Sequence, residues 1–210
     1  AGSLSILDGA QVQTLVRQAA GNVPAGQGNA GNININVRDA FTLDGVNFVP
    51  SSVISGLDFR ATGRGGNIDV EAGSFSITNG AQLTASTFGL GDAGNIDINV
   101  SNHLTVAGVN AGFTSRFTSN VGVGGVGNGG DINIQTNSLS ITDGAQVQTL
   151  VREAAGNAPA GQGNAGNINI NVRDAFTLDG VNVAPSTVTS DLDFGATGRA
   201  GNIDIEAGSF

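Results

Sequence analysis

The chain contains no cysteine, methionine, tryptophan or tyrosine, and its eight basic residues are all arginine. Without cysteine there is no disulfide framework and no thiolate metal site. No apolar run is long enough for a transmembrane helix or for the core of a signal peptide. Because there is no initiator methionine and both ends fall at the same phase of a repeat, we expect a slice of a longer array that continues in both directions.

The formal net charge of −9 limits the classes of partner. An acidic, lysine-free surface is repelled by nucleic acid and by anionic lipid, so neither nucleic-acid binding nor membrane insertion is expected. The 34 glycines would suit a flexible linker, but 39% of the residues are hydrophobic and they recur at regular positions. This regularity indicates a folded repeat protein.

The dominant feature is an internal repeat. Residues 3–75 align without a gap to residues 138–210, at an offset of 135, and 62 of the 73 aligned positions are identical. We therefore predict one β-helical repeat domain over residues 1–210, with super-repeats 3–137 and 138–210, the second incomplete. A shorter unit, Gly-Asn-Ile-x-Ile/Val or its variant Gly-Asp-Ile-Asn-Ile, recurs every 28 to 36 residues. It begins at Gly31, Gly66, Gly94, Gly130, Gly166 and Gly201.

Aligned short units form columns in which apolar and polar residues alternate, as in the segment Asn-Ile-Asn-Ile-Asn-Val at 32–37. Period-two alternation predicts β-strands with one buried and one exposed face. In the shortest unit we predict strands over 67–72, 74–78 and 81–87. Two of the expected inner columns are Ile33, Ile68, Ile96, Ile132, Ile168 and Ile203, and Leu4, Phe41, Phe75, Leu104, Leu139, Phe176 and Phe210.

A recurring column predicts that successive units stack on one another, because a sheet meander would not place one residue type at the same point of every unit. The expected fold is all-β, a right-handed parallel β-helix of about six coils. At about 4.8 Å per coil the six coils would rise about 29 Å. A single coil is not expected to be stable alone, because stacking supplies its buried surface.

The asparagine that follows each motif glycine occupies one corner of the coil. Stacked side-chain amides at this corner would hydrogen-bond along the axis as a structural ladder, although asparagine also simply tolerates a turn. The expected ladder consists of Asn32, Asn67, Asn95, Asn167 and Asn202.

Residues 66–100, GNIDVEAGSFSITNGAQLTASTFGLGDAGNIDINV, resemble the repeats of filamentous haemagglutinin-like proteins of the cyanobacterial type, and the resemblance covers essentially the whole chain. The most specific phrases are Gly-Ala-Gln-Leu-Thr-Ala-Ser-Thr at 80–87 and Gly-Asn-Ile-Asp. The resemblance implies a large adhesin secreted through an outer-membrane partner protein, a right-handed β-helical shaft, and adhesive or matrix roles. The secretion domain at that family's N-terminus is not in this sequence, so the route is implied by the repeats alone.

One set of carboxylates is a candidate metal site. Asp69 and Asp97 fall on adjacent coils, roughly 4.8 Å apart in register, with Glu71 beside them. Oxygen-rich pairs of this kind can hold Ca²⁺. The favoured interpretation is a solvated, mildly repulsive pair that discourages lateral sheet stacking, and no metal or other cofactor is expected.

Catalysis is not expected. The only histidine, His103, has no nucleophile and orienting acid beside it in the sequence, so we interpret it as a solvated residue on an outward position. A glycan-processing β-helix remains an alternative of a different class, but it would need clustered carboxylates and aromatic platforms. An ice-binding face would need a continuous Thr-x-Thr array, which the threonines do not form.

Variable loops are the expected sites of contact with partners, although they could equally be solvated bulges. The segments are 17–30 and 152–165, which are near-copies, and 48–64, 107–129 and 183–199. The favoured function is an extracellular or cell-surface fibre shaft that presents loops for cell–cell or cell–surface attachment. A structural sheath or matrix fibril without a receptor is the alternative. Expected partners are further copies of the array, head-to-tail or bundled, and a cell-surface or glycan receptor.

Overall fold

The computed structural model describes residues 1–45, 49–180 and 185–209. The secondary structure in these ranges consists of β-strands and turns, which confirms the all-β prediction. The described residues include no helix long and apolar enough to cross a membrane.

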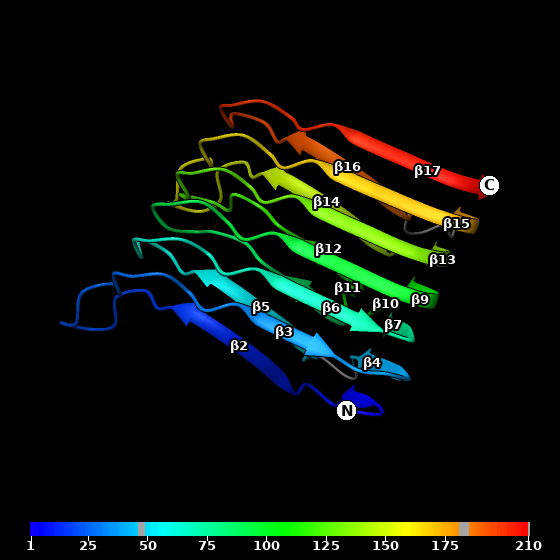
Figure 1. Ribbon diagram of the computed structural model, residues 1–210. Helices are drawn as coiled ribbons and strands as arrows, with labels where there is room; N and C mark the ends of the chain where they lie inside the picture. Colours follow the sequence, from blue (N-terminus) through cyan, green and yellow to red (C-terminus); the bar gives the residue numbers. More distant parts are fainter. Residues whose placement is uncertain (46–48, 181–184, 210) are drawn as a thin grey trace.

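Two parallel sheets, sheet 1 and sheet 2, run the length of the molecule (Figure 1). Sheet 1 contains β1 (Leu4–Ile6), β3 (Ile33–Asn36), β4 (Ala40–Asp44), β6 (Ile68–Ala72), β7 (Ser74–Thr78), β9 (Ile96–Ala107), β13 (Ile132–Thr142), β15 (Ile168–Asp179) and β17 (Ile203–Ser209). Sheet 2 contains β2 (Gln11–Val16), β5 (Ser52–Leu57), β8 (Gln82–Thr84), β12 (Arg116–Thr118), β14 (Gln146–Val151) and β16 (Thr187–Leu192). A small antiparallel hairpin joins β10 (Val109–Asn110) to β11 (Phe113–Thr114).

Equivalent residues of successive repeats pair directly across sheet 1. The pairing follows the predicted columns among the described residues, which do not include Phe210. Every pair of neighbouring strands in both sheets is parallel. One such line runs through Ile33, Ile68, Ile96, Ile132, Ile168 and Ile203. Along the loops, a further line of single parallel bridges links Gln27, Thr62, Leu90, Val126, Gln162 and Thr197.

The hydrophobic core lies between the two sheets. One cluster of buried residues includes the inner columns of sheet 1 together with Val53, Leu83, Phe117 and Val147 of sheet 2. Among its aromatic rings, Phe41 stacks on Phe75 with centroids 4.4 Å apart, which places equivalent rings of two repeats face to face. Apolar side chains of the last two strands of sheet 1 are more exposed. Leu178 on β15 is 46% exposed, and Ile203 on β17 is 39% exposed.

The strands predicted in the shortest unit are confirmed by β6, β7 and β8, although the third is shorter than expected. Three segments expected to be loops, however, each contain a strand of sheet 2, namely β5 in 48–64, β12 in 107–129 and β16 in 183–199. The physical reason is that β5 and β16 direct a serine as well as apolar residues inward, and Ser119 does the same directly after β12, so the alternation is hidden. Residues 48, 183 and 184 of these segments lie outside the described residues.

Glycine has two different roles at the corners. In the turns at 8–9, 79–80 and 143–144 both residues have positive φ, as in Asn79 (53°) and Gly80 (81°), which is typical of a type I′ turn. The motif glycines are needed for another reason, because an added Cβ on Gly130 would lie 2.1 Å from the carbonyl oxygen of Gly94. Gly130 does not have positive φ, and close contact between neighbouring backbones is what requires glycine there.

Candidate functional site

The corner asparagines hydrogen-bond from repeat to repeat. The Oδ1 of Asn32 accepts from the backbone N–H of Asn67 at 2.9 Å, and the Oδ1 of Asn67 accepts from the N–H of Asn95 at 3.0 Å. Asp131 continues the line between Asn95 and Asn167, and Asn167 accepts from the N–H of Asn202. The side chains therefore bond mainly to backbone groups of the next repeat rather than to one another, and an aspartate serves as well as an asparagine.

A second row of polar contacts lies inside the molecule, and the sequence analysis did not predict it. Buried serine or threonine hydroxyls of sheet 2 bond to the motif glycines that lead into sheet 1. The Oγ of Ser119, which is fully buried, donates to the carbonyl oxygen of Gly94 at 2.8 Å and accepts from the N–H of Gly130 at 2.9 Å. Ser55 and Ser190 make the equivalent pairs of contacts. Each of these serines precedes its glycine by 11 residues, and this constant spacing is the signal that could have revealed them.

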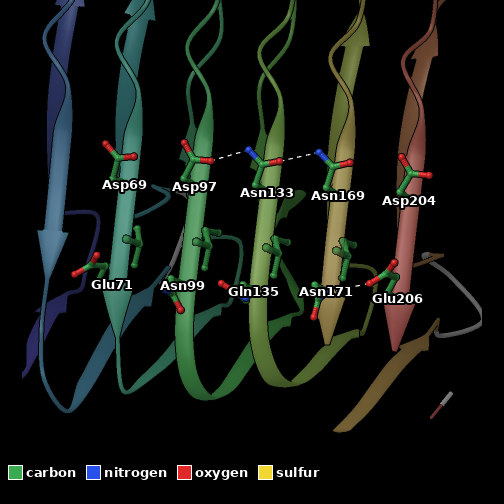
Figure 2. Close-up of a pocket in the computed structure, with 14 residues that line it drawn as sticks. Asp69, Glu71, Asp97, Asn99, Asn133, Gln135, Asn169, Asn171, Asp204 and Glu206 are labelled. Carbon is green, nitrogen blue, oxygen red and sulfur yellow. Dashed lines mark hydrogen bonds between the residues drawn. The ribbon is translucent and has the colours of Figure 1, made fainter. Parts of the chain in front are cut away.

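The outward face of sheet 1 carries the carboxylates considered as a calcium site. Figure 2 shows two rows of polar side chains on the neighbouring strands β6, β9, β13, β15 and β17, with acidic groups at both ends and amides between them. They border a groove of about 520 Å³ that no basic side chain lines. The rows are Asp69, Asp97, Asn133, Asn169 and Asp204, and Glu71, Asn99, Gln135, Asn171 and Glu206.

Asp69 and Asp97 are register partners on β6 and β9, as predicted. Partial burial is the main cause that raises the pKa of Asp69, and the charges of Asp97 and then Glu71 raise it further. Asp97 accepts a hydrogen bond from the Nδ2 of Asn133 at 2.7 Å, and Glu71 accepts one from Asn36 on the other side. The two carboxylates beside Asp69 are thus already bound by amides of neighbouring strands.

No grouping of three or more His, Cys, Asp or Glu side chains placed to hold a metal ion occurs among the described residues. The two rows of amides and carboxylates form a polar, acidic surface with hydrogen bonds between neighbouring strands. His103 is exposed beside the buried Leu104 and opposite Ser138 of the next strand.

The two near-copy loops fold in the same way. Ala20 and Val23 form a small antiparallel hairpin around Gly21, and Ala155 and Ala158 form its equivalent around Gly156. The two glycines have φ of 57° and 58°. Both loops leave the same edge of the molecule, where the strands of sheet 2 lead back to sheet 1 (Figure 1).

Each loop is closed by the same backbone hydrogen bond and tied to the following repeat by the same ion pair. The N–H of Gly26 donates to the carbonyl oxygen of Arg17, and the N–H of Gly161 donates to that of Arg152, both at 2.8 Å. Arg17 pairs with Asp58 at 3.9 Å, and Arg152 pairs with Asp193 at 3.3 Å. The two super-repeats therefore present equivalent loops.

Comparisons of the chain with protein-family models, with curated proteins and with solved structures found no match.

Proposed function

We propose that the chain forms a right-handed parallel β-helix of about six coils and serves as the shaft of an extracellular fibre whose repeated loops attach to cells or surfaces. In-register parallel pairing of equivalent residues in both sheets supports the stacking of coils. Right-handed crossover is the rule for parallel strands of one sheet. The resemblance to filamentous haemagglutinin-like repeats supports an extracellular location, with further copies of the array and a cell-surface or glycan receptor as partners.

The observation that carries the adhesive proposal is the pair of equivalent loops. Between Arg17 and Gly26 the residues are mostly exposed, and Val23 at the hairpin is 65% exposed. Four coils per super-repeat would place successive loops roughly 19 Å apart, at about 4.8 Å per coil. Weak contacts at a fixed spacing add through effective concentration, so a long array would adhere without any single tight site.

The test compares arrays of one, two and four super-repeats on beads, with adhesion to cells and to immobilised glycans as the readout. A matched control array has residues 18–25 and 153–160 replaced by a two-residue turn, which keeps both Arg–Asp pairs. We expect adhesion to rise steeply with copy number and to be lost from the loop-shortened arrays.

Two results would contradict the proposal. Equal adhesion of loop-shortened arrays that still assemble would make a structural sheath or matrix fibril the better account. Turnover of polysaccharide by the array would instead support a glycan-processing enzyme.

A further inference from the structure

A cavity of about 510 Å³ lies against the outward face of sheet 2. Arg116 and Thr118 of β12 line it, because the alternate residue Phe117 points into the core and leaves its neighbours on the outer face. The loop that begins at Arg152 and the segment around Phe88 form other parts of the wall. This volume lies in the range of sites for small molecules.

Arg116 is the one charged residue in its row across sheet 2. The residues that pair in register on the strands before and after it are all neutral. They are Gln11, Ser52, Gln82, Gln146 and Thr187. Equivalent positions of sheet 2 are therefore filled by neutral polar residues, so the packing of the sheet does not by itself require a cation at Arg116.

Arg116 and its neighbour Thr118 each have a buried polar atom that makes no hydrogen bond. The Nε of Arg116 and the Oγ1 of Thr118 are buried and have no hydrogen-bond partner. The guanidinium makes one hydrogen bond to the described residues, from Nη2 to the Oε1 of Gln82 at 3.1 Å. A guanidinium has five N–H donors, so four of them make no hydrogen bond to the described residues.

The charge of Arg116 is also uncompensated. None of the ion pairs among the described residues includes Arg116, whereas the neighbouring Arg152 is paired with Asp193. Asp58 lines the cavity too, but its carboxylate pairs with Arg17. Burial, and then the charge of Arg152, lower the pKa of Arg116. Because an unpaired buried charge is unfavourable, an anion in the cavity would stabilise this arrangement.

We propose that this cavity binds the carboxylate of a sugar acid of the uronic acid class, with Arg116 as the residue that pairs with it. The planar guanidinium matches a carboxylate, and a single negative charge balances a single unpaired cation. A doubly charged anion is opposed by Asp58 on the wall and by the net charge of −9. Amide and hydroxyl groups such as those of Gln148 and Thr84 suit ring hydroxyls, and the partly exposed ring of Phe88 offers an apolar surface. The site goes beyond the proposed fibre function and does not depend on it.

The experiment titrates glucuronate into the 210-residue chain, with glucose, sulfate and an acidic dipeptide as parallel probes. We expect glucuronate to raise the melting temperature and to shift the Nε–H signal of Arg116 in nitrogen–proton NMR spectra. Arg116→Gln, which installs the residue found at Gln82 and Gln146, should weaken glucuronate binding at least about tenfold. Arg38→Gln removes the same charge at a side chain that is 81% exposed and should bind like the unmodified chain.

An equal response to glucose, or an equal response of the Arg116→Gln variant, would overturn the proposal. Binding of sulfate or of the acidic dipeptide without glucuronate would assign the cavity to another ligand and would also overturn it. The NMR measurement needs no variant, so an unshifted Arg116 signal at saturating glucuronate refutes the site even if the substitution impairs folding.

Discussion

The column of motif glycines offers a direct test of how closely neighbouring repeats approach. A Cβ on Gly130 would lie 2.1 Å from the carbonyl oxygen of Gly94 and 2.9 Å from the backbone nitrogen of Asn95. Because both atoms belong to the backbone, no side-chain rotation relieves the overlap, and the two repeats must separate locally. Gly31 stands at the same position of the motif, but a Cβ there meets only the side chain of Thr14, at 3.7 Å from Cγ2 and 3.9 Å from Cβ.

Gly130→Ala should therefore be destabilising and Gly31→Ala should not. Overpacking costs about 1–3 kcal/mol, and weakening one neighbouring hydrogen bond, such as that from Gly130 to Ser119, adds about 1 kcal/mol. At about 2–4 °C per kcal/mol for a chain of this size, the melting temperature should fall by about 4–16 °C. Gly31→Ala should be neutral or stabilising by up to about 1 kcal/mol, because alanine restricts the unfolded chain.

The assay is thermal unfolding followed by circular dichroism, with amide hydrogen exchange to locate the change. Protection should fall around residues 94 and 130 in the first variant and nowhere in the second. Equal melting temperatures for Gly130→Ala and the unmodified chain would refute the close approach of these backbones.

Three further predictions concern the faces of sheet 1. Ile98→Asp should lower stability by about 4 kcal/mol or more, because Ile98 is 3% exposed and the new charge has no partner, whereas thermal melts of Asp97→Asn should match the unmodified chain. Since the pKa of Asp69 is raised in the fold, the folded state binds its proton more tightly than the unfolded state does. The contribution of Asp69 to stability should thus improve as the pH falls through this pKa, and Asp69→Asn should remove that part of the pH dependence in melts from pH 7 to pH 4. Added Ca²⁺ should leave the melting temperature unchanged, and a rise that Asp97→Asn abolishes would instead support calcium binding at Asp69 and Asp97.

The inner and outer columns of sheet 1 could be read from the sequence because they depend on a strictly local signal. Alternation of Ile and Asn around Ile33 determines which side is buried, and near-identical repeats then fix the register of the neighbouring strands. The local alternation does not explain why residue 130 is glycine. That requirement comes from the backbone carbonyl of Gly94, which is 36 residues earlier in the chain.

Most of sheet 2 could not be predicted from apolar alternation. Ser55 of β5 and Ser190 of β16 point inward, where their hydroxyls bond to the motif glycines, so their polarity hides the strands that carry them. The cavity at Arg116 was also beyond prediction, because its wall combines residues from several repeats with the loop at Arg152. Such a combination depends on how loops return over the sheet, which residue spacing does not specify.

The proposed adhesion depends on loops that recur along the array, whereas the proposed carboxylate binding depends on one cavity at Arg116. The loops at Arg17 and Arg152 recur with the same hairpin and the same ion pair, and repetition is what makes weak contacts effective. Arg116 belongs instead to residues 76–137, which have no second copy within these 210 residues, and its proposed role depends on one cavity rather than on recurrence. Because stacked repeats contact mainly their neighbours, one repeat can carry a distinct side chain without disturbing the register of the others. The array can therefore present equivalent loops and also carry a cavity with its own side chains. Replacing Arg116 would remove the cation of the cavity and leave both loops, whereas shortening only residues 18–25 would leave every residue of the cavity wall in place.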